Sequence, residues 1–568
     1  MLQRALLSTI LLVGASLASL IPSSRSVPND APVVRLNYGA FQGNVSGDLV
    51  QFLGMPFAAP PVGHLRFALP APPIPFKGIR NATSFGAACF QQKLSVPPAL
   101  PFSIAKNPVG GVSEDCLFIN VVAPASASRW GKLPVIMWIF GGGFEFGDTS
   151  GNPGDSVVAR SIALGEPIIY VSANYRLNAF GFLGGKELKN AGLGNIGLRD
   201  QRFAMEWIQT YILSFGGDPK RVTIWGESSG AWSVGLHHVI NNGVQGQLFS
   251  GGIMESGAPP SLRLISSNQP LFDQLVVDTG CKHATNALEC LRSVPYTNLT
   301  AAINRTPDLF SFNSLQLAWE PTIDGMVIKR DPMISVQKRL FSKVPIISGN
   351  CDDEGTLFAT STTNITTDAD FLNYLQTNYQ IPQAKLAAVA QAYPADVTQG
   401  SPFGTGTQND LTPQYKRLAA VQGDLFFQAP RRFFMQAMSR TQKTYAFLYK
   451  RGKVIPFPFL GAFHISDIPE FYGTVSISGT PPDFIGTDAL VNFVNTLDPN
   501  TPAKTATNSS SSLLQNIKWL PWGSSLTQPP MLTFTDPAPS VSITFDTYRK
   551  DAMNILNDIV LERASQLN

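Results

Sequence analysis

Apolar runs and helical patterns alternate along the middle of the chain. Four short runs, bounded by Gly, Pro or Asn, indicate buried strands at residues 135–140, 168–173, 222–225 and 344–347. Helical periodicity is clearest over residues 200–215, where apolar side chains recur every three or four positions. Strands that alternate with helices predict an α/β fold, with a mostly parallel sheet and helices on both faces. In such sheets the chemistry lies at the carboxyl ends of the strands, so the residues after each run are the first candidates.

The pattern Gly-x-Ser-x-Gly occurs at residues 226–230, directly after the third run. A helix is expected over residues 229–240, so Ser228 would lie on a tight turn between a strand and a helix. Gly226 and Gly230 suit this turn because side chains there would collide with the neighbouring strand and helix. The turn exposes the Ser228 hydroxyl near a helix N-terminus, which favours negative charge. Without this context the motif would indicate only an ordinary turn.

A serine nucleophile needs a base, because a free hydroxyl reacts weakly at neutral pH. In folds of this type the order along the chain is serine, acid, histidine, so the base should follow Ser228. His464, in the loop-forming segment 461–467, is preferred over His283, which lies between two cysteines. The five histidines of the chain are His64, His237, His238, His283 and His464.

Three acidic residues follow the fourth apolar run, at the edge of the sheet where the acid of a triad is expected. They are Asp352, Asp353 and Glu354. Residue type and spacing do not separate the three, and the segment would also suit a solvated acidic turn.

Three consecutive glycines, residues 141–143, follow the first run. Backbone N–H groups of such a loop can approach a substrate closely and stabilise the negative charge that develops on an ester carbonyl oxygen. A phosphate-binding loop is the alternative interpretation. The segment lacks the G-K-[ST] ending and the G-x-G-x-x-G spacing of nucleotide-binding loops, which favours an oxyanion hole.

The composition is that of a folded globular protein, with 44% hydrophobic and 14% charged residues in a chain of 568. The net charge is +3 and basic residues are mixed with acidic ones, so nothing indicates nucleic acid as a partner. Residues 1–18 are predicted to be a secretory signal peptide, with Arg4 before an apolar run that is too short to span a membrane. No later run is long enough to span a bilayer. We expect residues 19–568 to form a single catalytic domain that is secreted to the extracellular space.

Two further features agree with export. Five cysteines leave one unpaired, and the simplest pairing is local: Cys89 with Cys116 and Cys281 with Cys290, with Cys351 free and buried. A metal site is the alternative, but no zinc-like spacing of cysteine and histidine occurs. Six N-x-S/T triplets are possible glycosylation sites: Asn44, Asn81, Asn298, Asn304, Asn364 and Asn508.

Six segments together resemble the type-B carboxylesterase/lipase family, which includes fungal lipases and sterol esterases, animal carboxylesterases and cholinesterases. The resemblance covers essentially all of the mature chain. The segments are residues 52–67 (FLGMPFAAPPVGHLRF), 113–120 (SEDCLFIN), 138–144 (WIFGGGF), 226–230 (GESSG), 353–355 (DEG) and 461–464 (GAFH).

The resemblance implies an α/β-hydrolase fold and hydrolysis of carboxylic esters without a metal or an organic cofactor. It implies Ser228 as nucleophile, His464 as the proton shuttle and Glu354 as the acid that holds His464. It also implies an oxyanion hole, two disulfides and an ion pair. These are formed by the N–H groups of Gly142, Gly143 and Ser229, by Cys89–Cys116 and Cys281–Cys290, and by Arg66 with Glu114.

The chain departs from the family pattern in three respects. Ser229 stands where alanine is common, and Cys351 is non-standard. The loop between the first two cysteines, a flap in the lipase branch, is shorter than in long-lid lipases. It would serve equally as a mobile lid or as a fixed wall. Its apolar residues are Leu94, Val96, Leu100, Phe102 and Ile104.

The leading hypothesis is an ester hydrolase of the lipase or sterol-esterase kind, with a broad acyl range and an ester substrate that can lie at a lipid–water interface. An aryl or feruloyl esterase acting on plant-derived esters is the second hypothesis, because the 37 phenylalanines would suit an aromatic pocket. A non-catalytic, cholinesterase-like adhesion protein is the third. The presence of serine, acid and histidine together argues against the third hypothesis.

Overall fold

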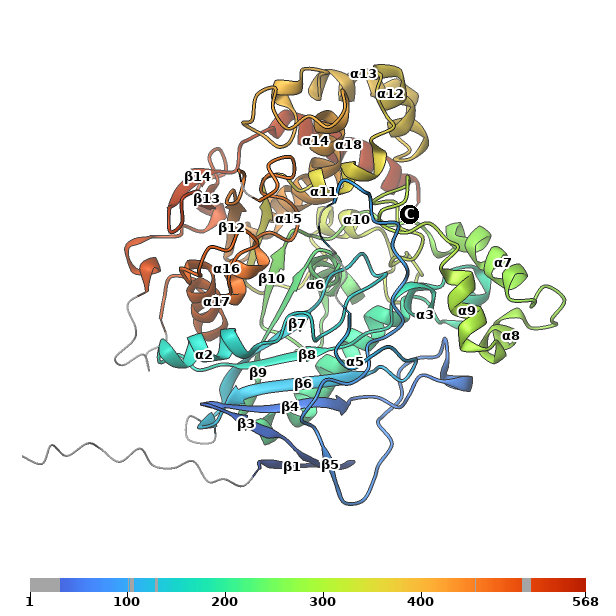
Figure 1. Ribbon diagram of the computed structural model, residues 1–568, viewed down its shortest axis with the longest axis vertical. Coiled ribbons are helices and arrows are strands. Elements are labelled where there is room, and N and C mark those ends of the chain that lie inside the picture. The colour runs from blue at the N-terminus through green and yellow to red at the C-terminus, as the bar shows by residue number, and fades with distance from the viewer. Residues whose placement is uncertain are drawn as a thin grey trace, which may run out of the picture. The chain divides into compact units, whose positions relative to one another are not determined.

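Eleven strands form the central sheet of the computed structural model, which describes residues 31–100, 102, 107–127, 131–454, 456–502 and 512–567 (Figure 1). The strand order is β14-β13-β12-β11-β10-β9-β7-β8-β6-β4-β3. The strands are β3 (Asn44–Ser46), β4 (Leu49–Pro56), β6 (Phe118–Pro124), β7 (Leu133–Ile139), β8 (Ile169–Ala173), β9 (Gly217–Glu227), β10 (Gly251–Glu255), β11 (Ile346–Cys351), β12 (Thr444–Tyr449), β13 (Pro530–Phe534) and β14 (Val541–Phe545).

The pairs from β8 through to β13 are parallel, whereas the strands at both edges are antiparallel. All residues of β7, β8, β10, β11 and β12 are buried, which explains why the central strands appear in the sequence as continuous apolar runs. The four predicted strands are confirmed. Three of them are longer than predicted: β7 begins at Leu133, β9 begins at Gly217 and includes the partly or fully exposed residues 218–221, and β11 continues through the buried residues 348–351.

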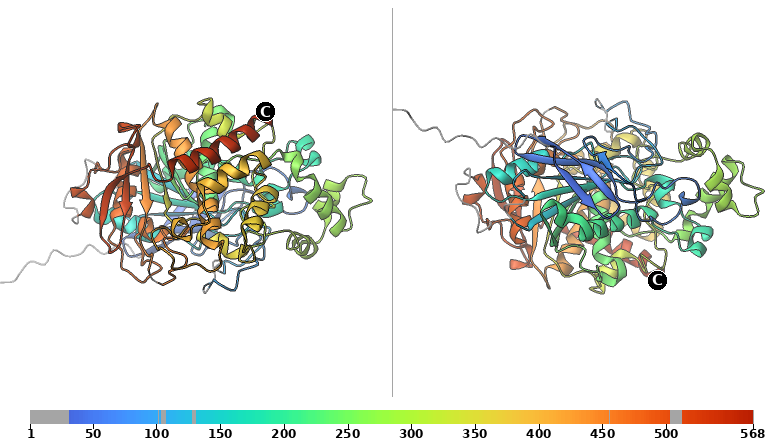
Figure 2. Two further views of the ribbon diagram at one scale, coloured as in Figure 1. Left: turned by 90° about the horizontal axis from the view of Figure 1, so that it is seen from above. Right: turned by 90° about the horizontal axis from the view of Figure 1, so that it is seen from below.

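Helices lie on both faces of the sheet (Figures 1 and 2). The helix α2 (Asp155–Ala163) contacts β6 and β8, and α17 (Ile485–Thr496) contacts β7, β9 and α2. The predicted helices are α5 (Ile196–Tyr211), extended by a 3-10 turn to Phe215, and α6 (Ser229–Val239). Every residue of α6 is buried, and α6 contacts β7, β9 and β10, so the residue before this helix is held firmly at the centre of the sheet.

A second hydrophobic cluster lies under a group of helices from the C-terminal half. It involves α12 (Asp368–Thr377), α13 (Gln383–Ala392), α14 (Tyr415–Gly423) and α18 (Lys550–Gln566). In Figure 1 these helices lie together at the top, with the red C-terminal helix α18 beside the yellow and orange ones. Helix α18 contacts α13, so the end of the chain packs against residues that precede it by roughly 160 to 180 positions.

Both expected disulfides are present, Cys89–Cys116 and Cys281–Cys290, and Cys351 is free and buried. The expected ion pair is also present, with Nε of Arg66 at 2.6 Å from Oε1 of Glu114. A small separate sheet of β1 (Val33–Leu36), β2 (Gly39–Gln42) and β5 (Ile79–Asn81) lies near the start of the described chain.

The predictions about export concern the signal peptide, the glycosylation triplets and the absence of a membrane span. The signal peptide and the triplet at Asn508 lie outside the described residues and stay predictions. From Pro32 onward the described residues group into one compact unit. Asn81, Asn298, Asn304 and Asn364 are exposed, whereas Asn44 is only partly exposed. No helix in the described ranges is both long enough and apolar enough to cross a bilayer.

Candidate active site

Ser228 occupies a strained turn between β9 and α6. Its φ of 55° and ψ of −126° are unusual for a residue with a side chain. A Cβ atom on Gly230 would lie 2.0 Å from the carbonyl oxygen of Ile139, and one on Gly226 would lie 2.5 Å from the backbone of Gly230. The sequence therefore places glycine on both sides of the serine because no larger residue fits there.

The acid and the histidine meet at the carboxyl ends of neighbouring strands. Glu354 lies just after β11, and His464 lies in the loop that follows β12. The Nδ1 atom of His464 lies 2.6 Å from Oε2 of Glu354, so the imidazole N–H donates a short hydrogen bond to this carboxylate. Of the three acidic residues left open by residue type and spacing, Glu354 alone contacts His464 in this way.

The two neighbouring aspartates have another partner. Nζ of Lys453 lies 2.6 Å from Asp352 and 2.9 Å from Asp353. Asp353 also accepts a hydrogen bond from the N–H of Ala462, at 2.9 Å. These contacts tie the segment before Glu354 to the segment before His464.

The other four histidines have surroundings that do not suit a base for Ser228. His237 and His238 are buried in α6, where they contact Gln201 and Ser342. Burial lowers the pKa of His238 to about 4, so its imidazole stays neutral in the core. His64 and His283 are exposed at the surface.

The second nitrogen of His464 is free to accept a proton. Its Nε2 atom lies 3.3 Å from Oε1 of Glu227 but makes no hydrogen bond to any residue that the structure describes. Burial raises the pKa of Glu227 well above its usual range, and the negative charges of Asp467, Glu255 and Glu354 raise it further. These surroundings therefore favour the uncharged form of Glu227 beside the imidazole.

The glycine loop lies directly beside the serine. A Cβ atom on Gly141 would lie 2.9 Å from the Cβ atom of Ser228, and Gly142 and Gly143 have positive φ angles of 104° and 62°. Among the described residues, no hydrogen bond is donated by the backbone N–H groups of Gly142, Gly143 or Ser229. Three donors are thus available next to the serine.

The hydroxyl of Ser229, the position that departs from the family pattern, contacts the same loop. Its Oγ accepts a hydrogen bond from the N–H of Phe144, at 3.3 Å. The hydroxyl therefore joins the start of α6 to the end of the glycine loop and leaves the backbone N–H of Ser229 free.

Ser228 and His464 line a cavity of about 890 Å³. Its walls are mainly aromatic and aliphatic, as expected for a site that receives an apolar ligand. Exposed Val475 and Ile477 lie at this cavity too, so an apolar surface continues to the solvent. The apolar wall residues include Phe102, Phe140, Phe146, Leu309, Phe310, Leu357, Phe358, Phe457, Ile465 and Ile468.

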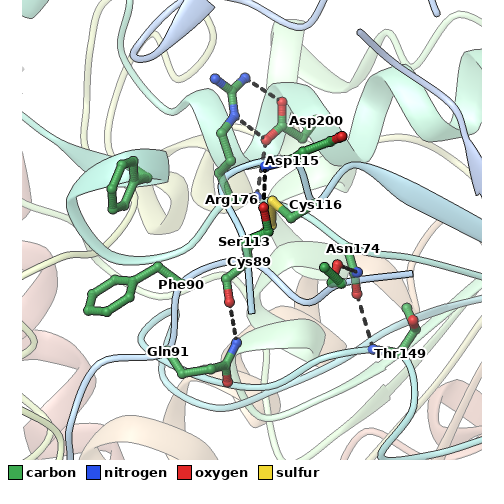
Figure 3. The surroundings of a disulfide bond; sticks show 12 residues. Cys89, Phe90, Gln91, Ser113, Asp115, Cys116, Thr149, Asn174, Arg176 and Asp200 are labelled. Atoms are coloured by element: carbon green, nitrogen blue, oxygen red, sulfur yellow. Dashed lines mark hydrogen bonds and ion pairs between the residues drawn. A yellow bond between two sulfur atoms is a disulfide. The ribbon is translucent and has the colours of Figure 1, made fainter. Parts of the chain in front are cut away.

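The loop between Cys89 and Cys116 contributes to the cavity and is anchored at its base (Figure 3). Phe102 of this loop stacks on Phe457, with ring centroids 5.0 Å apart. The side chain of Gln91 bonds to both the N–H and the carbonyl oxygen of Gly147, another cavity residue. Ile104 lies outside the described residues.

Sequence reasoning missed the residues that contact His464 and Glu354 from behind. Phe427 packs on the ring of His464 with a centroid distance of 4.7 Å, and Asn350 contacts Glu354. Phe427 has no distinguishing signal in the sequence. Asn350 does have one, because it is a polar residue directly after an apolar run and before the acidic segment. No group of three or more potential metal ligands occurs among the described residues.

A mostly parallel sheet, a serine on the turn after a central strand, and an acid and a histidine after later strands together define an α/β-hydrolase. The comparisons with known proteins agree. A profile described as the Carboxylesterase family matches residues 30–541. The chain therefore belongs to the carboxylesterase family and is a carboxylic ester hydrolase.

Among its relatives is "Lipase 5" of Diutina rugosa, which is 41% identical over 83% of this chain and 88% of that protein. "Secreted triacylglycerol lipase LIP1" of Gibberella zeae is 36% identical over 94% of this chain and 92% of that protein. Among solved structures, EstA of Aspergillus niger superposes with a TM-score of 0.78 and 27% identity, over 94% of this chain and 99% of that chain.

Proposed function

We propose that this protein hydrolyses carboxylic esters through an acyl-enzyme in which Ser228 is the nucleophile, His464 the general base and acid, and Glu354 the residue that orients His464. The N–H groups of Gly142, Gly143 and Ser229 stabilise the oxyanion. The observation that carries the proposal is the pair of environments of His464: Nδ1 is held by Glu354 at 2.6 Å, while Nε2 is unbonded in the cavity lined by Ser228.

The chemistry follows from these positions. The Ser228 hydroxyl gives its proton to Nε2 of His464 as its oxygen attacks the ester carbonyl, and the negative charge passes to the carbonyl oxygen. Three free N–H groups stabilise that charge without having to reorganise. Collapse of the intermediate breaks the ester bond, and the imidazolium returns the proton to the departing alcohol. Water then repeats the sequence on the acyl-enzyme, which releases the carboxylic acid and restores Ser228.

We infer that the substrates are esters with apolar acyl groups, presented at a lipid–water interface. The apolar walls of the cavity and the exposed Val475 and Ile477 support this inference, because apolar surface near a site favours contact with lipid. The names of the relatives in Diutina rugosa and Gibberella zeae, which are lipases, support it as well. Secretion, with removal of residues 1–18, is part of the same proposal.

Rates on p-nitrophenyl esters from acetate to palmitate, with Ser228→Ala beside the wild type, test the proposal. We expect Ser228→Ala to lower kcat by at least about 10³-fold and to abolish labelling by a fluorophosphonate, with an unchanged unfolding temperature. Ser565→Ala, at an exposed position of α18, serves as the control. Full activity in folded Ser228→Ala would refute the assignment. A rate that rises above the solubility limit supports an interfacial substrate, and faster turnover of methyl hydroxycinnamates would favour an aryl esterase.

A further inference from the structure

Each oxygen of the Glu354 carboxylate has its own partners. Oε2 accepts the hydrogen bond from Nδ1 of His464. Oε1 accepts two hydrogen bonds of 2.9 Å, one from Nδ2 of Asn350 and one from the backbone N–H of Cys351. Because both oxygens are bound, the carboxylate cannot rotate without breaking a hydrogen bond in a fully buried site. Asn350 and the backbone N–H of Cys351 therefore set the direction in which Oε2 faces the imidazole.

Asn350 can donate to Glu354 only if its amide has one of two orientations. Nε of Arg431 donates to Oδ1 of Asn350 at 2.7 Å, so Nδ2 must be the atom that faces Glu354. Arg431 is itself fixed, because its two terminal nitrogens donate to Asp546 at 2.6 and 2.9 Å. The side chains of Asn350 and Arg431 are both 0% exposed. These hydrogen bonds therefore lie away from bulk solvent.

The helix that carries Arg431 also supports the histidine. It consists of the π-helical turn η7 (Asp424–Gln428) followed by α15 (Ala429–Met438). Phe427 packs on the His464 ring, and Nε2 of Gln428 donates to the carbonyl oxygen of Cys351 at 2.8 Å. This one element therefore contacts both the base and the strand end that holds the acid. Short π-helical turns are uncommon and occur often at functional sites.

We propose that Asn350 is a positioning residue for the reaction, which orients Glu354 through Nδ2, and that Arg431 fixes the amide of Asn350 in the orientation that donates. The proposal rests on the function assigned above to Glu354. Asn350 touches neither the cavity nor Ser228, so its effect on catalysis must pass through Glu354. An apolar residue of similar size would fill the same space but would leave Oε1 with one donor.

The first test replaces Asn350 with leucine in the full-length protein. We expect kcat for a p-nitrophenyl ester to fall by about 10- to 100-fold, the range seen when an outer partner of a metal-bound side chain is removed, with KM changed less than about threefold. Asn492→Leu is the matched control. Asn492 is also buried and donates one side-chain hydrogen bond, to the carbonyl oxygen of Pro499, but it lies in α17 and does not line the cavity. Wild-type kcat in folded Asn350→Leu would overturn the proposal.

A double-mutant cycle separates positioning from a general effect on the fold. Glu354→Gln alone should lower kcat by up to about 10⁴-fold, as in the comparable change in a serine protease triad. If Asn350 acts through Glu354, adding Asn350→Leu to Glu354→Gln lowers kcat by less than about threefold further. The same loss in both backgrounds would mean that Asn350 acts on the fold and not through the acid.

A second variant covers the case in which Asn350→Leu does not fold. Asn350→Asp keeps an acceptor for Arg431, but its ionised carboxylate cannot donate to Glu354. At about pH 9 we expect a loss of kcat of at least about tenfold, and a change below about twofold would overturn the proposal. Failure of this proposal is distinct from failure of the proposed function, because Ser228→Ala would still be inactive while the Asn350 variants had wild-type rates.

Discussion

Replacing Asp467 or Asp546 by asparagine should change stability in opposite directions at neutral pH. Both side chains are almost completely buried, at 0% and 2% exposure. Their surroundings differ. Burial and the negative charge of Glu354 raise the pKa of Asp467 from 3.8 to about 7. The guanidinium groups of Arg431 and Arg432 overcome the effect of burial at Asp546 and hold its pKa well below the usual range.

The effect of Asp467 follows from the protons bound in each state. Between about pH 4 and pH 7 the unfolded chain loses the Asp467 proton, whereas the folded protein keeps it, so stability falls as pH rises through this window. A rise in pKa from 3.8 to about 7 corresponds to at most about 4 kcal/mol at pH 7 and above, at about 1.4 kcal/mol per pKa unit. Asparagine resembles the protonated acid and has no such loss. Asp467→Asn should therefore stabilise the protein at pH 7 and have little effect near pH 4.

The effect of Asp546 has the opposite sign. The folded protein holds the ionised form, so its contribution is complete above about pH 4 and is lost as pH falls further. Asp546 accepts five hydrogen bonds, four from the two arginines and one from Nε1 of Trp522. Asp546→Asn leaves the two arginine charges without their buried partner, which should cost about 3–5 kcal/mol at pH 7. The loss should shrink below about pH 4.

Urea unfolding of the wild type and of both variants, at several values between about pH 4 and pH 8, measures these differences. Where unfolding is irreversible, the unfolding temperature replaces the free energy. The reasoning is refuted if Asp467→Asn destabilises the protein equally at all pH values, since the raised pKa would then have no energetic consequence. It is also refuted if Asp546→Asn is neutral at pH 7.

Two more changes test the packing around the site. Gly230→Ala would place a Cβ atom 2.0 Å from the carbonyl oxygen of Ile139, so we expect a loss of about 3 kcal/mol or more and a lower kcat. Gly151→Ala is the control, because the nearest described atom to its Cβ would be the carbonyl oxygen of Asp148 at 3.6 Å, and equal unfolding temperatures for the two variants would contradict the steric argument. Trp232 contacts Phe144 and Phe427 and lines a second cavity of about 70 Å³. Phe427 also stacks on Phe358, which lines the active-site cavity, so removal of the Trp232 indole is expected to extend that cavity toward the second one. Trp232→Ala should then raise kcat/KM for p-nitrophenyl palmitate relative to butyrate by about tenfold, and an unchanged ratio would show that the second cavity does not receive the acyl chain.

Much of the fold could be predicted from the sequence because burial leaves a direct signal. The strands β7 and β8 are buried along their whole length and appear as apolar runs. The same signal fails at strand ends. Ser348 and Asn350 continue β11 although they are polar, and the buried amide of Asn350 is hydrogen-bonded to Glu354 and Arg431. The prediction of β11 therefore stopped short of the strand end that supports the acid.

Part of the site could be predicted from the sequence because some of its residues lie in short local motifs. The glycines around Ser228 and the acidic segment after β11 are local patterns, so they could be found in the sequence alone, whereas only the resemblance to the family favoured Glu354 over Asp352 and Asp353. The contact of Glu227 with His464 and the packing of Phe427 join segments far apart in the chain. No spacing rule connects such residues, and only the folded arrangement brings them together.

The support behind the acid also bears on why so many charges lie buried near this site. A buried ion pair gives little net stability, because removing charges from water costs about as much as their attraction returns. The pairs of Arg431 and Arg432 with Asp546 are therefore not needed for a stable core as such. Apolar side chains in their place could not supply directional hydrogen bonds. Arg431 has a fixed arrangement of donors, and only such an arrangement can hold Asp546 and orient the amide of Asn350 at the same time. If the proposal holds, these buried charges contribute through the orientation of Asn350, and the double-mutant cycle measures the last link, from Asn350 to Glu354.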